Sequence, residues 1–217
     1  MAEKKIAKHE ARAEKTYNPL DKVHLGESVA SEMLRKNPTQ LPLREKFIGA
    51  GIYALYYVGA FPLYRDIAKH NADGRFAWPI YVGKAVPQGV RKGGFGLGED
   101  PGTALRRRLR EHERSIEQCS NLEIADFFCR YLVVEDIWIP LGESLLIKQV
   151  SPLWNCVLDG FGIHKPGGGR GSQAMSLWDT IHPGRRLAHG LGANSIARDE
   201  IEGRVRRFIM DHPLNQA

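Results

Sequence analysis

Two short segments with the residue content of β-strands, 47–59 and 78–83, constrain the fold of this chain more than any other feature. Both are dense in Ile, Tyr, Leu and Val, which are enriched in strands, and glycines lie near their ends. The segment 127–134 has a similar aromatic and β-branched content. The sequence therefore predicts that the first two segments are strands of one sheet and that the third is a further strand.

The first of these segments continues without a charged residue as far as Tyr64 and could be mistaken for a membrane span. Residues 47–64 nevertheless contain three glycines, Pro62 and four tyrosines, which argues against a continuous apolar helix of that length. We therefore expect no contact with a membrane.

The overall composition is that of one soluble globular domain with appendages, because 217 residues can bury a sizeable core and 26% of them are charged. The 31 Lys and Arg outnumber the 25 Asp and Glu, and the resulting charge of +6 favours a polyanionic partner such as nucleic acid. The three cysteines form no Cys-x-x-Cys motif, which indicates free thiols in a reducing cytoplasm.

An arginine-rich segment after Thr103 has the periodicity of an amphipathic helix that this residue would cap. One face repeats at steps of three and four residues and consists of Leu105, Arg108, Leu109, His112 and Ile116. Arg108 and His112 are therefore expected to point inward. The charged residues of the other faces are expected to form a solvated surface, which includes Arg106, Arg107, Arg110, Glu113 and Arg114.

A second helix is predicted to begin at Pro140, where the missing N–H is harmless. One of its faces consists of apolar residues and one carboxylate, namely Glu143, Leu146, Ile147 and Val150. A lone inward carboxylate needs a partner. Pro152 is expected to end this helix, and Asn155 follows almost at once.

Composition divides the chain into three parts. Residues 1–45 are expected to form a basic arm with a short helix within 26–36, which could contact DNA or a second subunit. Residues 46–158 form the expected core, with insertions after residues 59 and 86. Residues 159–217 are expected to form a basic glycine-rich loop and a helical extension, whose last helix would be capped by Ser195.

The inward polar residues supply what phosphodiester hydrolysis requires, namely an activated water and cations that offset the charge of the transition state. Glu143 is an oxygen ligand suited to Mg²⁺, and Arg108 can offer its guanidinium to the scissile phosphate. A tyrosine is a base near neutral pH only if its phenolate is stabilised, and Arg108, Lys84, His112 and the metal could each do so. His112 could also relay or directly accept the proton of the water.

Over residues 47–155 the chain resembles the GIY-YIG nuclease domain. The resemblance rests on Gly51-Ile52-Tyr53, on Tyr81-Val82-Gly83-Lys84-Ala85, on Arg108 followed by His112, and on the run from Glu143 through Pro152 to Asn155. It implies an α+β fold with a small three-stranded antiparallel sheet flanked by helices, here with an N-terminal arm, long loop insertions and a C-terminal helical extension.

The same resemblance implies roles for individual residues. Tyr53 and Tyr81 would be the motif tyrosines, followed by Lys84 as the motif lysine. Arg108 would be the arginine that contacts the phosphate, Glu143 the metal ligand and Asn155 the supporting amide. The segment 56–59, Tyr-Tyr-Val-Gly, is a rival for the second motif, but Tyr81 is preferred because a lysine and an alanine follow its glycine.

Several features resemble the type II restriction endonucleases that carry this domain, and the chain looks closest to those that cut CCGCGG. These features are the insertions, the tail around 178–185, and His112 at a position where repair members often have a tyrosine. The resemblance implies hydrolysis of double-stranded DNA by a homodimer with one divalent metal ion per site, Mg²⁺ with Mn²⁺ as a substitute. It also implies a bacterial cytoplasmic protein whose functional counterpart is a cognate DNA methyltransferase.

A GC palindrome suits a chain with basic loops, because arginine or lysine bonded to guanine O6 and N7 is the commonest specific contact in the major groove. A palindrome would be matched by a two-fold dimer with one active site on each strand. The candidate base-reading residues are Arg91, Lys92, Arg170, Arg185 and Arg186.

Two other functions stay open at this point. One is a DNA repair or mobile-element nuclease of the same superfamily, which would recognise structure rather than sequence. The other is a non-catalytic DNA-binding module that retains the fold. Discrete fragments of plasmid DNA would favour restriction, nicking only at branches or lesions would favour repair, and binding without cleavage would favour the third reading.

Overall fold

The computed structural model describes residues 16–87, 101–163 and 174–216. Its centre is an antiparallel sheet with the strand order β1-β4-β2-β3. The strands are β1 (Thr39–Gln40), β2 (Gly51–Tyr57), β3 (Tyr81–Ala85) and β4 (Phe127–Val133). Helices flank this sheet, so the predicted α+β class is confirmed.

In the described part of the chain the sheet has four strands, whereas three were expected. The additional strand, β1, is two residues long and pairs with β4 through Thr39↔Cys129 and Gln40↔Phe128. Two residues are too short to give an alternating pattern, and they lie between Pro38 and Pro42, within the part of the chain that was expected to be an arm with a short helix. The three longer strands, β4-β2-β3, are the antiparallel set that was expected.

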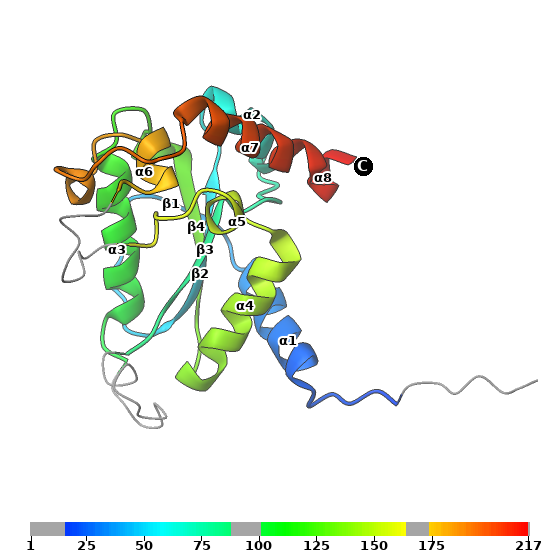
Figure 1. Cartoon of the computed structure of the whole chain (residues 1–217). Helices are drawn as coiled ribbons and strands as arrows, with labels where there is room; N and C mark the ends of the chain where they lie inside the picture. The colour runs from blue at the N-terminus through cyan, green and yellow to red at the C-terminus, as the bar shows by residue number, and fades with distance from the viewer. Residues whose placement is uncertain (1–15, 88–100, 164–173, 217) are drawn as a thin grey trace, which may run out of the picture.

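Strand β2 lies inside the sheet and is buried along its whole length, which explains its uncharged sequence. Helix α3 (Ala104–Glu117) covers one face, and α1 (Lys22–Arg35) and α4 (Ile139–Val150) cover the other, as Figure 1 shows. Helices α1 and α4 pack closely: a Cβ at Gly142 would lie 2.7 Å from Val29 Cγ1 and 3.4 Å from Ile52 Cδ1.

The remaining elements connect or extend this core. The insertion that was expected after residue 59 contains η1 (Pro62–Tyr64) and α2 (Arg65–Asn71). The shorter helices after the sheet are η3 (Ile124–Asp126), η4 (Asp136–Trp138), α5 (Leu153–Cys156), α6 (Leu177–Ile181), η6 (Arg186–Ala188) and α8 (Pro213–Gln216). The longest helix of the C-terminal extension is α7 (Arg198–Asp211).

Three local expectations need correction. Helix α1 begins earlier than expected, at Lys22, because the side chain of Asp21 accepts a hydrogen bond from Val23 N and caps it. The expectation that Ser195 caps the last helix is wrong, since the N-cap residue of α7 is Ala197. Glu113 was expected on a solvated surface, but it is 4% exposed. It is buried because residues 43–45 cover this side of α3, where its Oε1 accepts from Leu43 N at 2.9 Å.

Aromatic side chains form much of the core beneath the C-terminal extension. Trp154 and Trp178 are both buried, with ring centroids 5.5 Å apart. Phe161 lies 4.9 Å from Trp178. Of the helices formed by the described residues, none combines the length and the apolar content that crossing a bilayer would demand.

Candidate active site

The two motif tyrosines face the same side of the sheet. Tyr53 in β2 lies opposite Gly83, and Tyr81 in β3 lies opposite Leu55. Because residues two apart in a strand share a face, both rings lie on the side covered by α3, with centroids 6.2 Å apart. Tyr56 of the rival motif lies on the other face of β2, where Arg130 donates to its hydroxyl at 2.8 Å.

Helix α3 brings His112 and Arg108 to these tyrosines. His112 is fully buried, and its Nε2 lies 2.5 Å from Tyr53 Oη. Arg108, one turn earlier, donates from Nη1 to Glu111 Oε2 at 3.2 Å and from Nη2 to the carbonyl of Gly162 at 2.6 Å. The side chain of Arg108 is 23% exposed, so the guanidinium lies at the margin between the core and solvent.

Burial dominates the electrostatics of both tyrosines. It raises the pKa of Tyr53 well above 10.0, with a further contribution from Tyr81, while Arg108 lowers it through its charge and a hydrogen bond. Burial also raises the pKa of Tyr81, again opposed by the charge of Arg108. Near neutral pH both residues are therefore phenols rather than phenolates.

The opposite face of β3 carries Lys84, which lies across from Ile52 in β2. Its Nζ is 2.6 Å from Oε2 of Glu143 in α4, so the carboxylate predicted to need a partner has one. The side chain of Glu143 is 16% exposed. Burial is the main cause of the raised pKa values of Tyr81 and Tyr53, and the negative charge of Glu143 raises both further. The site therefore extends around the edge strand β3, from α3 on one face to α4 on the other.

Asn155, in α5, bonds with the backbone of the edge strand. Its Oδ1 accepts from Val82 N at 2.8 Å, and its Nδ2 donates to Val82 O at 2.9 Å. One side-chain amide thus replaces the neighbouring strand that β3 lacks on this side. Val82 lies between Tyr81 and Gly83, so these bonds hold the second motif in place.

The second motif needs glycine at position 83 for a steric reason. Gly83 lies opposite Tyr53, and a Cβ at this position would collide with Oη and Cζ of that tyrosine. Glycine therefore allows the phenol to cross over β3 toward His112.

The geometry agrees with a comparison against known protein families. The family model described as the Eco29kI GIY-YIG domain matches residues 45–209, about three quarters of the chain. The chain belongs to this family. It is a family of restriction endonucleases, and Eco29kI itself cuts CCGCGG. No curated protein sequence matches the chain at a significant level.

Membership in the Eco29kI GIY-YIG family makes the protein a nuclease of the GIY-YIG superfamily and makes DNA its substrate. Nucleases of this superfamily generally use divalent metal ions. In the described residues, no group of three or more His, Cys, Asp or Glu side chains could enclose an ion. The single carboxylate of Glu143 instead fits Mg²⁺, which keeps most of its waters and needs only one or two protein carboxylates.

The candidate base-reading residues have different surroundings. Arg91, Lys92 and Arg170 lie outside the described residues. Arg186 is exposed at the start of η6, and its backbone N donates to Gln118 Oε1 at 2.8 Å. Arg185 is 3% exposed, and all five of its N–H donors bond within the protein, so in this structure it presents no donor to a base edge.

Sequence reasoning missed two residues of the site, Phe161 and Gly162. The ring of Phe161 stacks on His112 with centroids 4.4 Å apart and an angle of 21° between planes. The carbonyl of Gly162 accepts from Arg108, and a Cβ at this glycine would lie 2.7 Å from Tyr81 Oη. In the sequence, the one sign of these two residues is a lone aromatic residue between two glycines, Gly160-Phe161-Gly162, in a segment that was otherwise predicted to be a basic loop.

Proposed function

We propose that this protein is a type II restriction endonuclease that hydrolyses both strands of double-stranded DNA at a GC-rich palindrome, CCGCGG. The observation that carries the proposal is the convergence of a phenol–imidazole pair, a guanidinium and a carboxylate at the edge strand β3. Family membership supports the same reaction class and, through Eco29kI, the same target sequence.

The Tyr53–His112 pair is proposed to accept the proton of the attacking water. Tyr53 is a phenol near neutral pH because burial raises its pKa, so it is a poor base by itself. Its oxygen lies 2.5 Å from His112 Nε2, within reach for proton transfer. As Tyr53 Oη takes a proton from water, its own proton passes to Nε2, and the positive charge forms on the imidazole.

Arg108 is proposed to contact the scissile phosphate. Its guanidinium lies at the solvent margin beside both tyrosines, and the carbonyl of Gly162 and the carboxylate of Glu111 fix its orientation. A fixed guanidinium stabilises the negative charge that develops on phosphate oxygens in the transition state. Tyr81, on the same face, is proposed to orient the water or the phosphate through its hydroxyl.

Glu143 is the proposed metal ligand, and Lys84 is proposed to hold its carboxylate in place. Their 2.6 Å ion pair fixes the carboxylate on the α4 side of β3. A bound Mg²⁺, for which Mn²⁺ could substitute, would offset charge on the phosphate and on the leaving 3′ oxygen. Asn155 is proposed to act through β3, by holding Val82 between Tyr81 and Gly83.

Cutting both strands of a palindrome with one site per subunit calls for a homodimer with two-fold symmetry. We propose Arg91, Lys92, Arg170 and the exposed Arg186 as contacts to guanine or phosphate. A methyltransferase that modifies the same sequence would protect the DNA of the host cell.

The test of this function compares Glu143→Gln with Glu202→Gln. Both changes remove a carboxylate charge from a helix, and the two side chains are similarly exposed, 16% for Glu143 and 24% for Glu202. With Mg²⁺ and plasmid DNA containing CCGCGG, the unchanged protein and Glu202→Gln should give discrete double-strand fragments. Glu143→Gln should cut at least about 10³-fold more slowly while its DNA affinity stays within about tenfold.

Sequencing the fragment ends reports the site, the stagger and the symmetry of cutting together. Ends within another defined sequence would keep the restriction function and replace CCGCGG as its target. Nicks confined to branched DNA would favour a repair nuclease, and binding without cleavage would favour a non-catalytic module. Full cleavage by Glu143→Gln would remove this carboxylate from the mechanism.

A further inference from the structure

Arg185 and Asp179 form a buried ion pair in the C-terminal extension, outside the proposed catalytic residues. Their side chains are 3% and 5% exposed. Nε and Nη2 of the arginine donate to Oδ1 and Oδ2 of the aspartate, each at 2.7 Å. Asp179 Oδ2 also accepts from Ser176 Oγ at 2.7 Å. A pair this well bonded has one geometry, because a shifted guanidinium would leave buried charge without partners.

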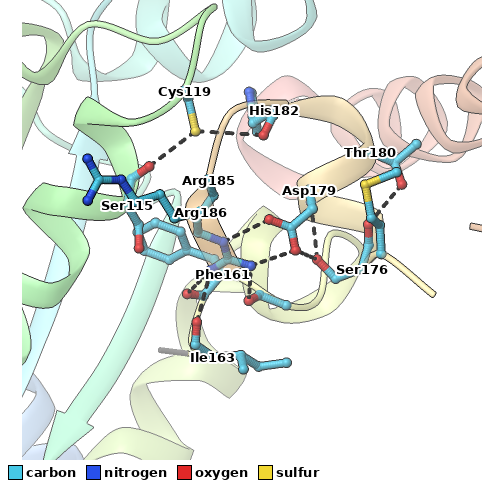
Figure 2. A network of polar contacts seen from close by, with 12 residues as sticks. Ser115, Cys119, Phe161, Ile163, Ser176, Asp179, Thr180, His182, Arg185 and Arg186 are labelled. Carbon is cyan, nitrogen blue, oxygen red and sulfur yellow. Dashed lines mark hydrogen bonds and ion pairs between the residues drawn. The ribbon is translucent and has the colours of Figure 1, made fainter. Parts of the chain in front are cut away.

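The remaining donors of Arg185 bond with a short loop that runs past it. Nη1 donates to the carbonyls of Phe161 and Ile163 at 3.2 and 3.0 Å, and Nη2 donates to that of Gly160 at 3.0 Å. Figure 2 shows the guanidinium between Asp179 and this loop. The start of this loop also requires glycine, since Gly160 has a φ of +103° and a Cβ there would collide with Ser176.

The same loop delivers two groups to the active site. The carbonyls of Gly160, Phe161 and Ile163 bond with Arg185, whereas that of Gly162 bonds with Arg108 at 2.6 Å. The ring of Phe161 stacks on His112. One buried arginine therefore fixes the loop that in turn fixes two residues of the site.

A buried ion pair is an unusual way to gain stability, because apolar residues of the same volume often stabilise a protein as well or better. Its distinctive property is directional bonding, which an apolar core lacks. We propose that Arg185, locked by Asp179, is a positioning residue that sets the orientation of Arg108 and His112 through residues 160–163. This inference rests on the proposed function, in which those two residues serve cleavage.

The experiment compares Arg185→Lys with Arg106→Lys in the full chain. Lysine keeps the charge but has no planar fork for the aspartate and three carbonyls. Arg106 is the matched control, since it also pairs with a buried carboxylate, that of Glu113 at 3.3 Å. It likewise donates to backbone carbonyls, those of Leu43 and Glu45, at 2.5 and 3.2 Å, but these belong to the segment 43–45 before β2, which bonds with Glu113 through Leu43 N.

Three quantities are measured for each variant: the free energy of unfolding in urea, the DNA affinity without metal, and the single-turnover cleavage rate at saturating enzyme. Both variants should lose stability, and both should bind DNA within about threefold of the unchanged protein. Only Arg185→Lys should also lose cleavage rate, by about 10- to 100-fold, because small displacements of catalytic groups have effects of this size. Arg106→Lys should cleave within about twofold of the unchanged protein.

Several results would overturn the inference. An Arg185→Lys protein that is folded and cleaves at the normal rate would show that the ion pair has no positioning role. Rate losses that follow stability equally in both variants would show a purely structural role. If Arg185→Lys does not fold, Asp179→Asn removes the charge that locks Arg185 while keeping the shape of the side chain, and a normal single-turnover rate in that variant would be equally decisive. A chain that cuts no DNA at all would overturn the proposed function together with this inference.

Discussion

Replacing Asn155 with alanine should release the edge strand that carries the second tyrosine motif. The amide bonds with both backbone groups of Val82, at 2.8 and 2.9 Å, and Val82 is fully buried. Because β3 is the last strand of the sheet that the described residues form, no other strand of that sheet can take over these groups. Alanine would leave one N–H and one C=O without their partner.

The size of the effect follows from these two bonds. A buried backbone group left without its hydrogen bond costs about 1–3 kcal/mol. Asn155 is itself only partly buried, so water can reach part of the gap after truncation. We therefore expect Asn155→Ala to lower the free energy of unfolding by about 2–3 kcal/mol, a large fraction of the stability of a typical domain.

Urea unfolding measures the global loss, and hydrogen exchange read by mass spectrometry locates it. Amides of residues 81–85 should exchange about 10- to 100-fold faster in the variant, because the strand opens locally. The control is Asn194→Ala, whose amide also makes two backbone bonds, to Met175 O at 2.7 Å and from Ile196 N at 2.9 Å. It should leave exchange in 81–85 unchanged. Normal exchange and stability in Asn155→Ala, combined with lost cleavage, would refute this reasoning and indicate a direct contact between Asn155 and DNA or metal.

Two further predictions concern packing and protonation. Gly83→Ala should cost about 1–3 kcal/mol of stability and about 100-fold in single-turnover rate, because its Cβ would displace Tyr53. Gly203→Ala, whose Cβ meets no atom within 4 Å, should be neutral or stabilising in the same assays. Burial, with a smaller effect of Arg198, lowers the pKa of His182 to about 3, whereas the unfolded chain binds this proton near pH 6.5. Stability should therefore fall as pH drops from about 6.5 toward 3, and at pH 5 by about 2 kcal/mol from this group. In urea unfolding at pH 7.5 and pH 5, His182→Gln should lack that part of the loss, and an equal loss in both proteins would count against a neutral buried imidazole.

The strands could be predicted because their signal is local. Residues 51–57 are buried on both faces, so side-chain content alone marks them as a strand. The expected strand began too early, at residue 47, because the chain just before β2 bonds elsewhere. Gly49 N donates to Gly102 O at 2.7 Å, and Gly49 O accepts from Leu105 N at 3.0 Å. Hydrogen bonds between backbone groups do not depend on the side chains, so the sequence could not predict them.

The helical period gave the inward orientation of His112 correctly, but it failed for Glu113. The period describes which residues share a face, and it does not say what covers each face. Residues 43–45, about seventy positions earlier in the chain, pack over Glu113 and turn an apparently solvated charge into a buried ion pair with Arg106. Only the tertiary structure brings this segment to α3.

Arg185 illustrates a deeper limit of sequence reasoning. In a basic tail an arginine is a natural candidate for DNA contact, since surface arginines bind phosphate and guanine. Its surroundings in the structure are one buried carboxylate and three backbone carbonyls. Every residue has a backbone carbonyl, so the sequence does not indicate which carbonyls will bond with an arginine. Charge counts cannot separate an arginine that contacts DNA from one that bonds with a buried loop, as Arg185 does with residues 160–163. The difference lies in whether its five donors already have partners, and that question can be answered only with the folded chain.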